Sequence, residues 1–328
     1  MKTERRRPKL ASLKLQRALL ALCCLSLTIA VALPSISLDR EIIDVLVVVD
    51  VTQSMNVLDY ELDGRAVSRL TFAKHALRES LPKLPCGSRM GLGIFTEYRS
   101  FLLLTPVEVC ANRRELAALI DRINGQMSWA SGSQVAKALY SGLLAAKTLE
   151  TLPALAFITD GHESPPINPH YRPEFTGTAG EIKGIIVGAG GFKPLPIPKF
   201  DPEGQRLGFW GADEVQQTDP YTRGRSSNVP GEQMVDTIPL GPVSPALQVM
   251  PGREHLSNLH EPYLRLLARE TELAFARLTS LESLTTALTD RALKRSETVP
   301  TDLRWLPALA ALLLVSALYL LAWVVKRR

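Results

Sequence analysis

The sequence predicts an α/β fold, a doubly wound and mostly parallel sheet with one antiparallel hairpin, flanked by transmembrane helices. Short apolar runs rich in β-branched residues alternate along the chain with segments in which leucine recurs at helical spacing. Two of the runs, residues 42–49 and 155–159, are almost unbroken, which is typical of strands buried on both faces. Apolar stretches of about bilayer-spanning length also lie near both ends of the chain.

The two ends of the chain predict its topology. Residues 1–17 and residues 326–328 form basic tails. Residues 18–38 predict an N-terminal membrane anchor or, because Ala30-Val31-Ala32 fits the small-x-small cleavage pattern, a signal peptide. Residues 305–325 predict a transmembrane helix. Since positive residues prefer the cytoplasmic side, both tails are expected there, with the residues between the two spans on the opposite side.

The positive net charge belongs to the tails. The chain has a formal net charge of +5, whereas the two tails carry ten positive charges and one negative charge. The difference between +5 and the +9 of the tails leaves −4 for the rest of the chain. A negatively charged domain has no electrostatic basis for binding nucleic acid.

The predicted elements between the spans follow the order of an α/β domain. After the first strand come a helix, the antiparallel hairpin, two more helices, two strands, and then a helix, a strand and a closing helix. Their ranges are 70–84, 89–95 with 101–105, 113–123, 134–149, 155–159, 182–187, 263–273, 274–278 and 281–288.

Residues 192–254 differ in character and are predicted to be an insertion that divides the domain into residues 42–191 and 255–290. The segment contains ten prolines and little periodicity, and a long irregular stretch in a compact domain is usually functional or disordered. It also contains Phe209, Trp210 and Tyr221, residue types that anchor interfaces. Because it leaves from the carboxyl end of a strand, we expect it to contact a partner; a passive surface flap is the alternative.

Two cysteines flank the predicted hairpin. Cys86 and Cys110 are each twelve residues from Tyr98, which places them opposite one another at the open end of the hairpin. In an oxidising compartment this arrangement predicts a disulfide, and two buried thiols are the alternative.

Three polar segments indicate a metal site. Asp50, Thr52 and Ser54 follow the first buried strand, Ser133 lies in a loop of small residues that opens a helix, and Asp160 ends the strand of residues 155–159. Carboxylate and hydroxyl oxygens are hard ligands of the kind that Mg²⁺ prefers. The carboxyl ends of parallel strands are also where open α/β sheets bind ligands.

In this order, the three segments resemble the metal-ion-dependent adhesion site of the von Willebrand factor type A (vWA) family, a Rossmann-like fold. The resemblance implies that the residues just named hold Mg²⁺, with Mn²⁺ or Ca²⁺ as alternatives, and that a partner protein supplies an acidic residue to the ion. Thr52 stands where the family has Ser, and Ser133 stands where it has Thr. Both positions keep the hydroxyl group.

His162 and Glu163 follow the third segment and are expected to lie beside the site and support its ligands, or to form part of a solvated loop. The sequence has no H-E-x-x-H motif, serine elbow or P-loop, so an enzyme is not expected. A metal-dependent hydrolase that uses His162 or Glu163 as its base is the weaker alternative.

Longer sequence segments resemble one particular group of proteins within the vWA family. The segments 50–55, 86–89, 93–99 and 157–163, and 208–210, 212–215 and 217–221 in the insertion, are similar to the MxaL-type membrane proteins of bacterial methanol dehydrogenase systems. That similarity implies a protein of the bacterial inner membrane with its soluble domain in the periplasm and its C-terminus in the cytoplasm. It also implies an accessory role in the maturation or metal loading of a quinoprotein methanol or alcohol dehydrogenase, with that enzyme or its assembly factors as partners. A more distant resemblance, to the vWA membrane proteins of aerotolerance operons, implies instead a subunit of an envelope complex.

Overall fold

The chain folds into two compact units, which are treated separately. The structure, a computed structural model, describes residues 7–32, 36–129, 132–167, 172–215, 232–234, 245–247 and 252–327. The larger unit comprises residues 41–295, and the smaller unit combines residues 1–40 with residues 296–328.

The smaller unit contains two packed helices, α1 (Arg7–Ala32) and α7 (Trp305–Arg327). The buried thiol of Cys23 on α1 donates to the carbonyl oxygen of Ala311 on α7, with a sulfur–oxygen distance of 3.7 Å. Lys14–Ala32 is long and apolar enough to cross a membrane, whereas the apolar part of α7 among the described residues, Trp305–Leu321, is shorter. Of the two predicted spans, the first is therefore long and apolar enough, within the described residues, to cross a membrane.

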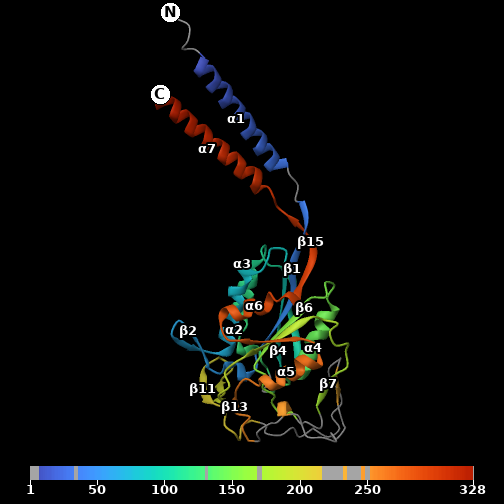
Figure 1. The fold of residues 1–328 in the computed structure, drawn as a ribbon. Coiled ribbons are helices and arrows are strands. Elements are labelled where there is room, and N and C mark those ends of the chain that lie inside the picture. The colour runs from blue at the N-terminus through green and yellow to red at the C-terminus, as the bar shows by residue number, and fades with distance from the viewer. Residues whose placement is uncertain are drawn as a thin grey trace, which may run out of the picture. The chain divides into compact units, whose positions relative to one another are not determined.

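The larger unit is built on a central sheet, and the predicted fold class is confirmed (Figure 1). The strand order is β14-β8-β6-β1-β4-β5, and β15 also pairs with β1. All neighbouring pairs along this order are parallel except the β4–β5 hairpin. The bounds of these strands are β1 (Ile36–Asp50), β4 (Arg89–Thr96), β5 (Arg99–Glu108), β6 (Ala154–Thr159), β8 (Gly184–Ala189), β14 (Ala274–Leu278) and β15 (Lys294–Thr301).

Helices cover both faces of the sheet, which explains the unbroken apolar run of β1. Val45, Val47 and Val49 pack into one core with α2 (Arg69–Ser80), α3 (Arg113–Arg122) and α6 (Leu281–Leu288). Leu46 and Val48, which alternate with them, pack into a second core with α4 (Val135–Thr148) and α5 (Glu261–Glu270). Because successive side chains of a strand point to opposite faces, a strand between two helical layers must be apolar at every position.

The part of the insertion that the structure describes contains short strands that were not predicted. This part contains β9 (Leu195–Pro196), a hairpin of β10 (Pro198–Phe200) and β11 (Arg206–Phe209), β12 (Glu232–Met234) and the single turn η4 (Pro245–Leu247). β9 pairs with β13 (Leu256–Ser257), and β12 pairs with β7 (Pro173–Phe175), which lies outside the insertion. These strands are too short to produce a readable alternation in the sequence. Strands β2 (Tyr60–Leu62), β3 (Arg65–Val67) and β15 were missed as well.

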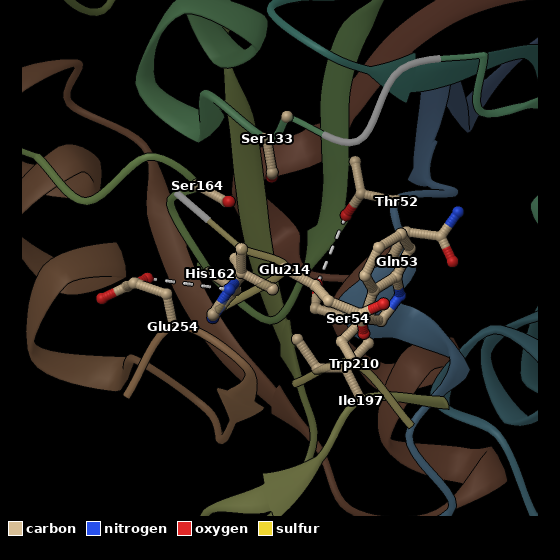
Figure 2. Close-up of a pocket in the computed structure, with 12 residues that line it drawn as sticks. Thr52, Gln53, Ser54, Ser133, His162, Ser164, Ile197, Trp210, Glu214 and Glu254 are labelled. Carbon is tan, nitrogen blue, oxygen red and sulfur yellow. Dashed lines mark hydrogen bonds and ion pairs between the residues drawn. The ribbon is translucent and has the colours of Figure 1, made fainter. Parts of the chain in front are cut away.

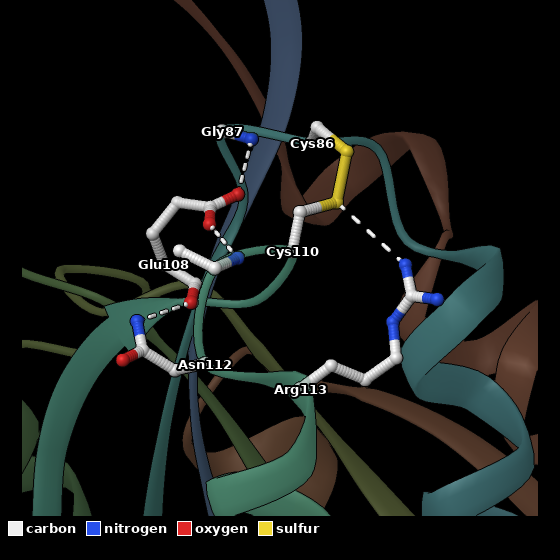
Figure 3. Close-up of a disulfide and its surroundings, with 7 residues drawn as sticks. Cys86, Gly87, Glu108, Cys110, Asn112 and Arg113 are labelled. Carbon is white, nitrogen blue, oxygen red and sulfur yellow. Dashed lines mark hydrogen bonds between the residues drawn. A yellow bond between two sulfur atoms is a disulfide. The ribbon is translucent and has the colours of Figure 1, made fainter.

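A disulfide joins Cys86 to Cys110 at the open end of the β4–β5 hairpin, with a Cα–Cα distance of 5.3 Å (Figure 3). The carboxylate of Glu108, the last residue of β5, accepts hydrogen bonds from the backbone N–H groups of Gly87 at 2.8 Å and Ala111 at 2.5 Å. Both cysteine-bearing turns are thus fastened to the end of the same strand.

Candidate metal site

Asp50 and Asp160 lie at the same edge of the sheet. Asp50 is the last residue of β1, and Asp160 directly follows β6, which pairs with β1 in parallel, Val49 opposite Ile158. Gly161 turns the chain away from this edge with a φ of +79°. A Cβ at this position would lie 3.0 Å from Cγ of Leu264, so both the backbone conformation and the packing require glycine.

The first loop is folded by hydrogen bonds to Asp50. Oδ1 of Asp50 accepts from the backbone N–H of Thr52 at 2.8 Å and from its hydroxyl at 2.7 Å. The hydroxyl of Thr159 donates to Oδ2 at 2.6 Å. An Asp that bonds the backbone two residues later forms a local turn. The turn brings the hydroxyl oxygens of Thr52 and Ser54 to within 3.3 Å of one another.

The second loop presents Ser133. Its backbone forms two hydrogen bonds of 2.7 Å with Ser164, and the neighbouring Gln134 N–H donates to the carbonyl oxygen of Glu97 at 2.6 Å. The loop is therefore held between the tip of the β4–β5 hairpin and the loop after β6. The hydroxyl of Ser133 is buried and has no hydrogen-bond partner among the described residues. A buried polar group without a partner costs about 1–3 kcal/mol, so this oxygen is suited to an additional ligand.

Asp160 already has a cationic partner, which sequence reasoning missed. Nη1 of Arg69 donates to Oδ2 of Asp160 at 2.6 Å, and Ser257 Oγ donates to the same oxygen at 3.0 Å. The backbone N–H of His162 donates to Oδ1 at 2.9 Å. Arg69 is fully buried at the first position of α2, where the sequence offered no more than a charged residue at a helix start.

The two aspartates differ in their electrostatic compensation. Burial raises the pKa of Asp50 to about 7, the negative charge of Asp160 adds to the rise, and hydrogen bonds from Thr159 and Thr52 oppose it. Burial also raises the pKa of Asp160, but the Arg69 guanidinium, together with His162 and the hydrogen bonds that the carboxylate accepts, holds the pKa below its ordinary value. Asp50 is therefore the buried carboxylate whose charge lacks a neighbouring cation.

The residues at this edge fit a hard divalent cation. Hydroxyls of Thr52, Ser54 and Ser133 supply neutral oxygens, and the carboxylates of Asp50 and Asp160 supply charge. Each carboxylate oxygen has about two acceptor sites, so the existing hydrogen bonds leave capacity for an ion or its bound water. An ion here would satisfy the hydroxyl of Ser133 and compensate the charge of Asp50. Of the five residues predicted as ligands, Thr52, Ser54 and Ser133 line one pocket, whereas Asp50 and Asp160 are fully buried at the strand ends and do not line it.

His162 and Glu163 have different environments. His162 is buried at the pocket, with Nε2 at 3.9 Å from Oε2 of Glu254, and burial lowers its pKa to about 4. Glu163 points elsewhere: its Oε1 accepts from the Tyr263 hydroxyl at 2.6 Å and from Ala136 N–H at 3.0 Å. Burial raises the pKa of Glu163 to about 7. Glu163 therefore ties the first turn of α4 to α5 and does not line the pocket.

The insertion closes one side of the site and makes it a pocket of about 150 Å³, here called the edge pocket. Figure 2 shows Ser133 and Ser164 on one side of it, and Ile197 and Trp210 on the opposite side. The lining residues from the sheet edge are Thr52, Gln53, Ser54, Gly132, Ser133, His162 and Ser164, and those from the insertion are Ile197, Trp210, Glu214, Val215 and Glu254.

The three aromatic residues predicted to contact a partner are not equivalent. Trp210 is half-buried and lines the edge pocket, whereas Phe209 is 49% exposed on the outer side of the β10–β11 hairpin end. Tyr221 lies outside the described residues.

Comparisons with known proteins give similarity to solved structures alone. No protein-family model matches the chain, and no curated protein matches it. One similar structure is an aerotolerance-related membrane protein from Bacteroides fragilis, at 16% identity and a TM-score of 0.47, covering 76% of this chain and 98% of that one.

Two further structures are more distant. A membrane-spanning protein from Vibrio fischeri is 18% identical with a TM-score of 0.28, covering 75% of this chain and 93% of that one. A von Willebrand factor type A structure from Catenulispora acidiphila is 12% identical with a TM-score of 0.31, covering 45% of this chain and 33% of that one.

Proposed function

We propose that this chain is a membrane-anchored vWA-type protein that binds a partner protein through a divalent cation held by Asp50, Thr52, Ser54, Ser133 and Asp160. One observation carries the proposal: the buried hydroxyl of Ser133 has no partner among the described residues, and Ser133 lines the same pocket as Thr52 and Ser54. The raised pKa of Asp50 supports it, because a cation is the simplest group that would compensate this buried carboxylate.

Recognition is favoured over turnover by the composition of the edge pocket. Three of the five proposed ligands are neutral hydroxyls, so a bound Mg²⁺ would keep enough positive charge to attract a carboxylate from the partner. An activated nucleophile needs a base within hydrogen-bond reach. The Ser133 hydroxyl has no such base among the described residues. The pocket therefore has the chemistry of a binding site.

The partner is proposed from resemblance. A subunit of an envelope complex of the aerotolerance kind is the first candidate, with the larger unit in the periplasm and the C-terminus in the cytoplasm. An accessory role in maturing or metal-loading a quinoprotein alcohol dehydrogenase is the second. This second role is favoured by the segment Gly208-Phe209-Trp210 and its neighbours in the insertion, which resemble the MxaL-type proteins. Mg²⁺ is the proposed ion for either role, and Mn²⁺ or Ca²⁺ would suit the same oxygens.

The experiment compares partner capture by the wild type and by Ser133→Ala. This variant removes one proposed ligand without breaking a hydrogen bond, so the fold should be unaffected. The full-length protein is purified from membranes in Mg²⁺ or in EDTA, and bound proteins are identified by mass spectrometry. We expect the wild type to retain a partner in Mg²⁺ alone and the variant to lose most of it.

Thr285→Val is the matched control, since the hydroxyl of Thr285 on α6 also lacks a hydrogen-bond partner among the described residues and Thr285 does not line the edge pocket. It should retain the partner as the wild type does. A partner retained equally in EDTA and by Ser133→Ala would overturn the proposal. If the purified protein turned over a substrate and Ser133→Ala lost this activity, the protein would be a metal-dependent hydrolase and not a recognition protein.

A further inference from the structure

Three residues that line the edge pocket have a buried polar atom without a hydrogen-bond partner among the described residues: Ser133 Oγ, His162 Nδ1 and Trp210 Nε1. Trp210 follows β11, and its backbone N–H donates to the carbonyl oxygen of Ile197 at 3.0 Å. Nζ of Lys199 lies over the indole ring, 4.7 Å from its centroid. Both contacts fix the ring, yet its Nε1 is buried with no hydrogen-bond partner among the described residues.

The indole N–H can donate a hydrogen bond, whereas the unpartnered hydroxyl oxygen of Ser133 can act as a ligand to an ion. Trp210 and Ser133 line the same pocket of about 150 Å³ and come from opposite sides of it (Figure 2). A tryptophan N–H can only donate a hydrogen bond. The ligand atom that reaches it must therefore be an acceptor, and the ligand must be small enough to share the pocket with an ion.

We propose that Trp210 Nε1–H is a specificity-determining donor that recognises a carboxylate bound at the ion. One carboxylate oxygen contacts the cation and the other accepts the indole hydrogen bond. This inference rests on the proposed function and assigns the insertion a direct part in it. A carboxamide is rejected, because its NH₂ group would face the indole N–H, donor against donor.

The acidic residues of the insertion that line the pocket are already engaged elsewhere. The carboxylate of Glu214 pairs with Nζ of Lys199 and accepts from Gly211 N–H at 2.9 Å. The Glu254 carboxylate lies beside His162 Nε2 at 3.9 Å. Among the described acidic residues that line the pocket, neither Glu214 nor Glu254 is hydrogen-bonded to the indole N–H, so we assign this donor to a carboxylate from outside the chain. Its source is an acidic side chain of a partner protein or a free small carboxylic acid.

The test titrates the full-length protein in detergent micelles at saturating Mg²⁺. The probes are acetate for a free acid, a blocked Gly-Glu-Gly peptide for a protein side chain, and the blocked Gly-Gln-Gly peptide as the amide control. The variant is Trp210→Phe, which keeps an aromatic ring and removes the N–H. Trp129→Phe is the matched control, because Trp129 is 60% exposed and does not line the edge pocket.

A hydrogen bond to a charged group is worth about 1.5–3 kcal/mol, so Trp210→Phe should bind the Glu peptide roughly 10- to 150-fold more weakly. Mg²⁺ affinity measured without probe should be unchanged. In wild-type protein labelled with ¹⁵N, the Trp210 indole resonance should shift when the Glu peptide is added. The Gln peptide should bind weakly to the wild type and equally weakly to Trp210→Phe. Acetate that matches the Glu peptide would identify a free acid as the natural ligand.

The outcomes separate this inference from the proposed function. If the wild type fails to bind Mg²⁺, the metal site itself is wrong. If Mg²⁺ and the Glu peptide bind but Trp210→Phe binds the peptide as tightly as Trp129→Phe does, the inference is overturned while the site stands. A Trp210 resonance that shifts with Mg²⁺ alone and not with peptide would also overturn it, because the N–H would then serve the chain's own carboxylate.

Discussion

Arg69 and Asp160, which are 91 residues apart in sequence, form a fully buried ion pair with an Nη1–Oδ2 distance of 2.6 Å. The same guanidinium binds the carboxylate of Asp59 at 2.8 Å, and that carboxylate accepts from the backbone N–H of Gly191 at 2.9 Å. Arg69 also donates to Ser257 Oγ at 2.6 Å. Since Gly191 and Ser257 flank the insertion, Arg69 connects a proposed metal ligand to both ends of the insertion.

Replacing Arg69 should destabilise the larger unit strongly. In Arg69→Met the carboxylates of Asp59 and Asp160 lose their cation while remaining buried. Breaking a buried ion pair from one side costs about 3–5 kcal/mol. Arg78→Met is the matched control, because the Arg78–Asp121 pair is about half exposed and such pairs contribute less than about 1 kcal/mol. Denaturant unfolding followed by fluorescence would measure the difference; equal effects in the two variants would refute the structural importance of Arg69.

Asp50→Asn should separate metal binding from folding. The substitution keeps the size of the side chain and removes the buried charge that Asp160 opposes. In EDTA we expect a melting temperature at least as high as that of the wild type. In the wild type, Mg²⁺ at a hundred times its Kd should add about 2.7 kcal/mol of stability, and the variant should lack this gain. Thermal melts with and without Mg²⁺ measure both effects, and Asp213→Asn, at an exposed position of the insertion that does not line the edge pocket, serves as control. An undiminished Mg²⁺ response in Asp50→Asn would exclude this residue as a ligand.

Glu163 should make stability depend on pH. Its pKa rises from 4.5 in the unfolded chain to about 7 in the folded protein, chiefly through burial. The folded state therefore binds the proton more tightly, and stability falls as pH rises from about 4.5 to about 7. Glu163→Gln keeps an acceptor for Tyr263 and removes the charge. Because the Glu163 side chain is only partly buried, we expect Glu163→Gln to stabilise the protein by roughly 1–2 kcal/mol at pH 8 and by little at pH 5.

The measurement for Glu163 is the melting temperature of wild type and variant between pH 5 and pH 8, in EDTA so that metal binding does not contribute. Glu203→Gln, an exposed position, gives the baseline. A Glu163→Gln advantage that is the same at both pH values would contradict the assignment.

The Cys86–Cys110 disulfide should stabilise the larger unit through the unfolded chain. The cysteines are 24 residues apart, and closing a loop of this size is worth about 3 kcal/mol in the chain-entropy account. The double variant Cys86→Ser, Cys110→Ser should unfold at a correspondingly lower temperature, whereas Cys24→Ser, a free exposed cysteine, should not. Peptide mapping of non-reduced protein from native membranes should recover the linked pair. Two alkylatable thiols there would refute the disulfide, and an oxidising location with it.

Removing the insertion should abolish partner binding and spare the ion. Residues 192–254 contain none of the five proposed metal ligands, and Gly191 and Ser257, which contact the Asp59–Arg69 pair, remain in place. A variant with a short Gly/Ser linker in place of residues 192–254 should bind Mg²⁺ with wild-type affinity by calorimetry. It should fail to capture the partner from membranes. Full capture by a folded variant would reduce the insertion to a passive flap.

Much of the fold was readable because its signals are local. The unbroken apolar run of β1 and the helical spacing of α2 depend on residues close together in sequence, so both elements were predicted, although β1 begins at Ile36, before the predicted residue 42. β15 was missed because Lys294–Thr301 is largely polar, and no local pattern marks its pairing with β1. The hairpins of the insertion were missed because two- to four-residue strands are shorter than any periodicity.

The sequence by itself determined which oxygens gather at the sheet edge. Asp50 and Asp160 end neighbouring parallel strands, and the carboxyl ends of such strands meet at one edge whatever the rest of the chain does. Only the tertiary structure decided which charges have an opposite charge nearby and which polar groups have a hydrogen-bond partner. It places Arg69 against Asp160, and among the residues it describes it gives no hydrogen-bond partner to the Ser133 hydroxyl or the Trp210 indole. The reason is physical: chemistry is carried by residue type, whereas burial, pairing and pKa depend on neighbours that are distant in sequence and meet only when the core forms.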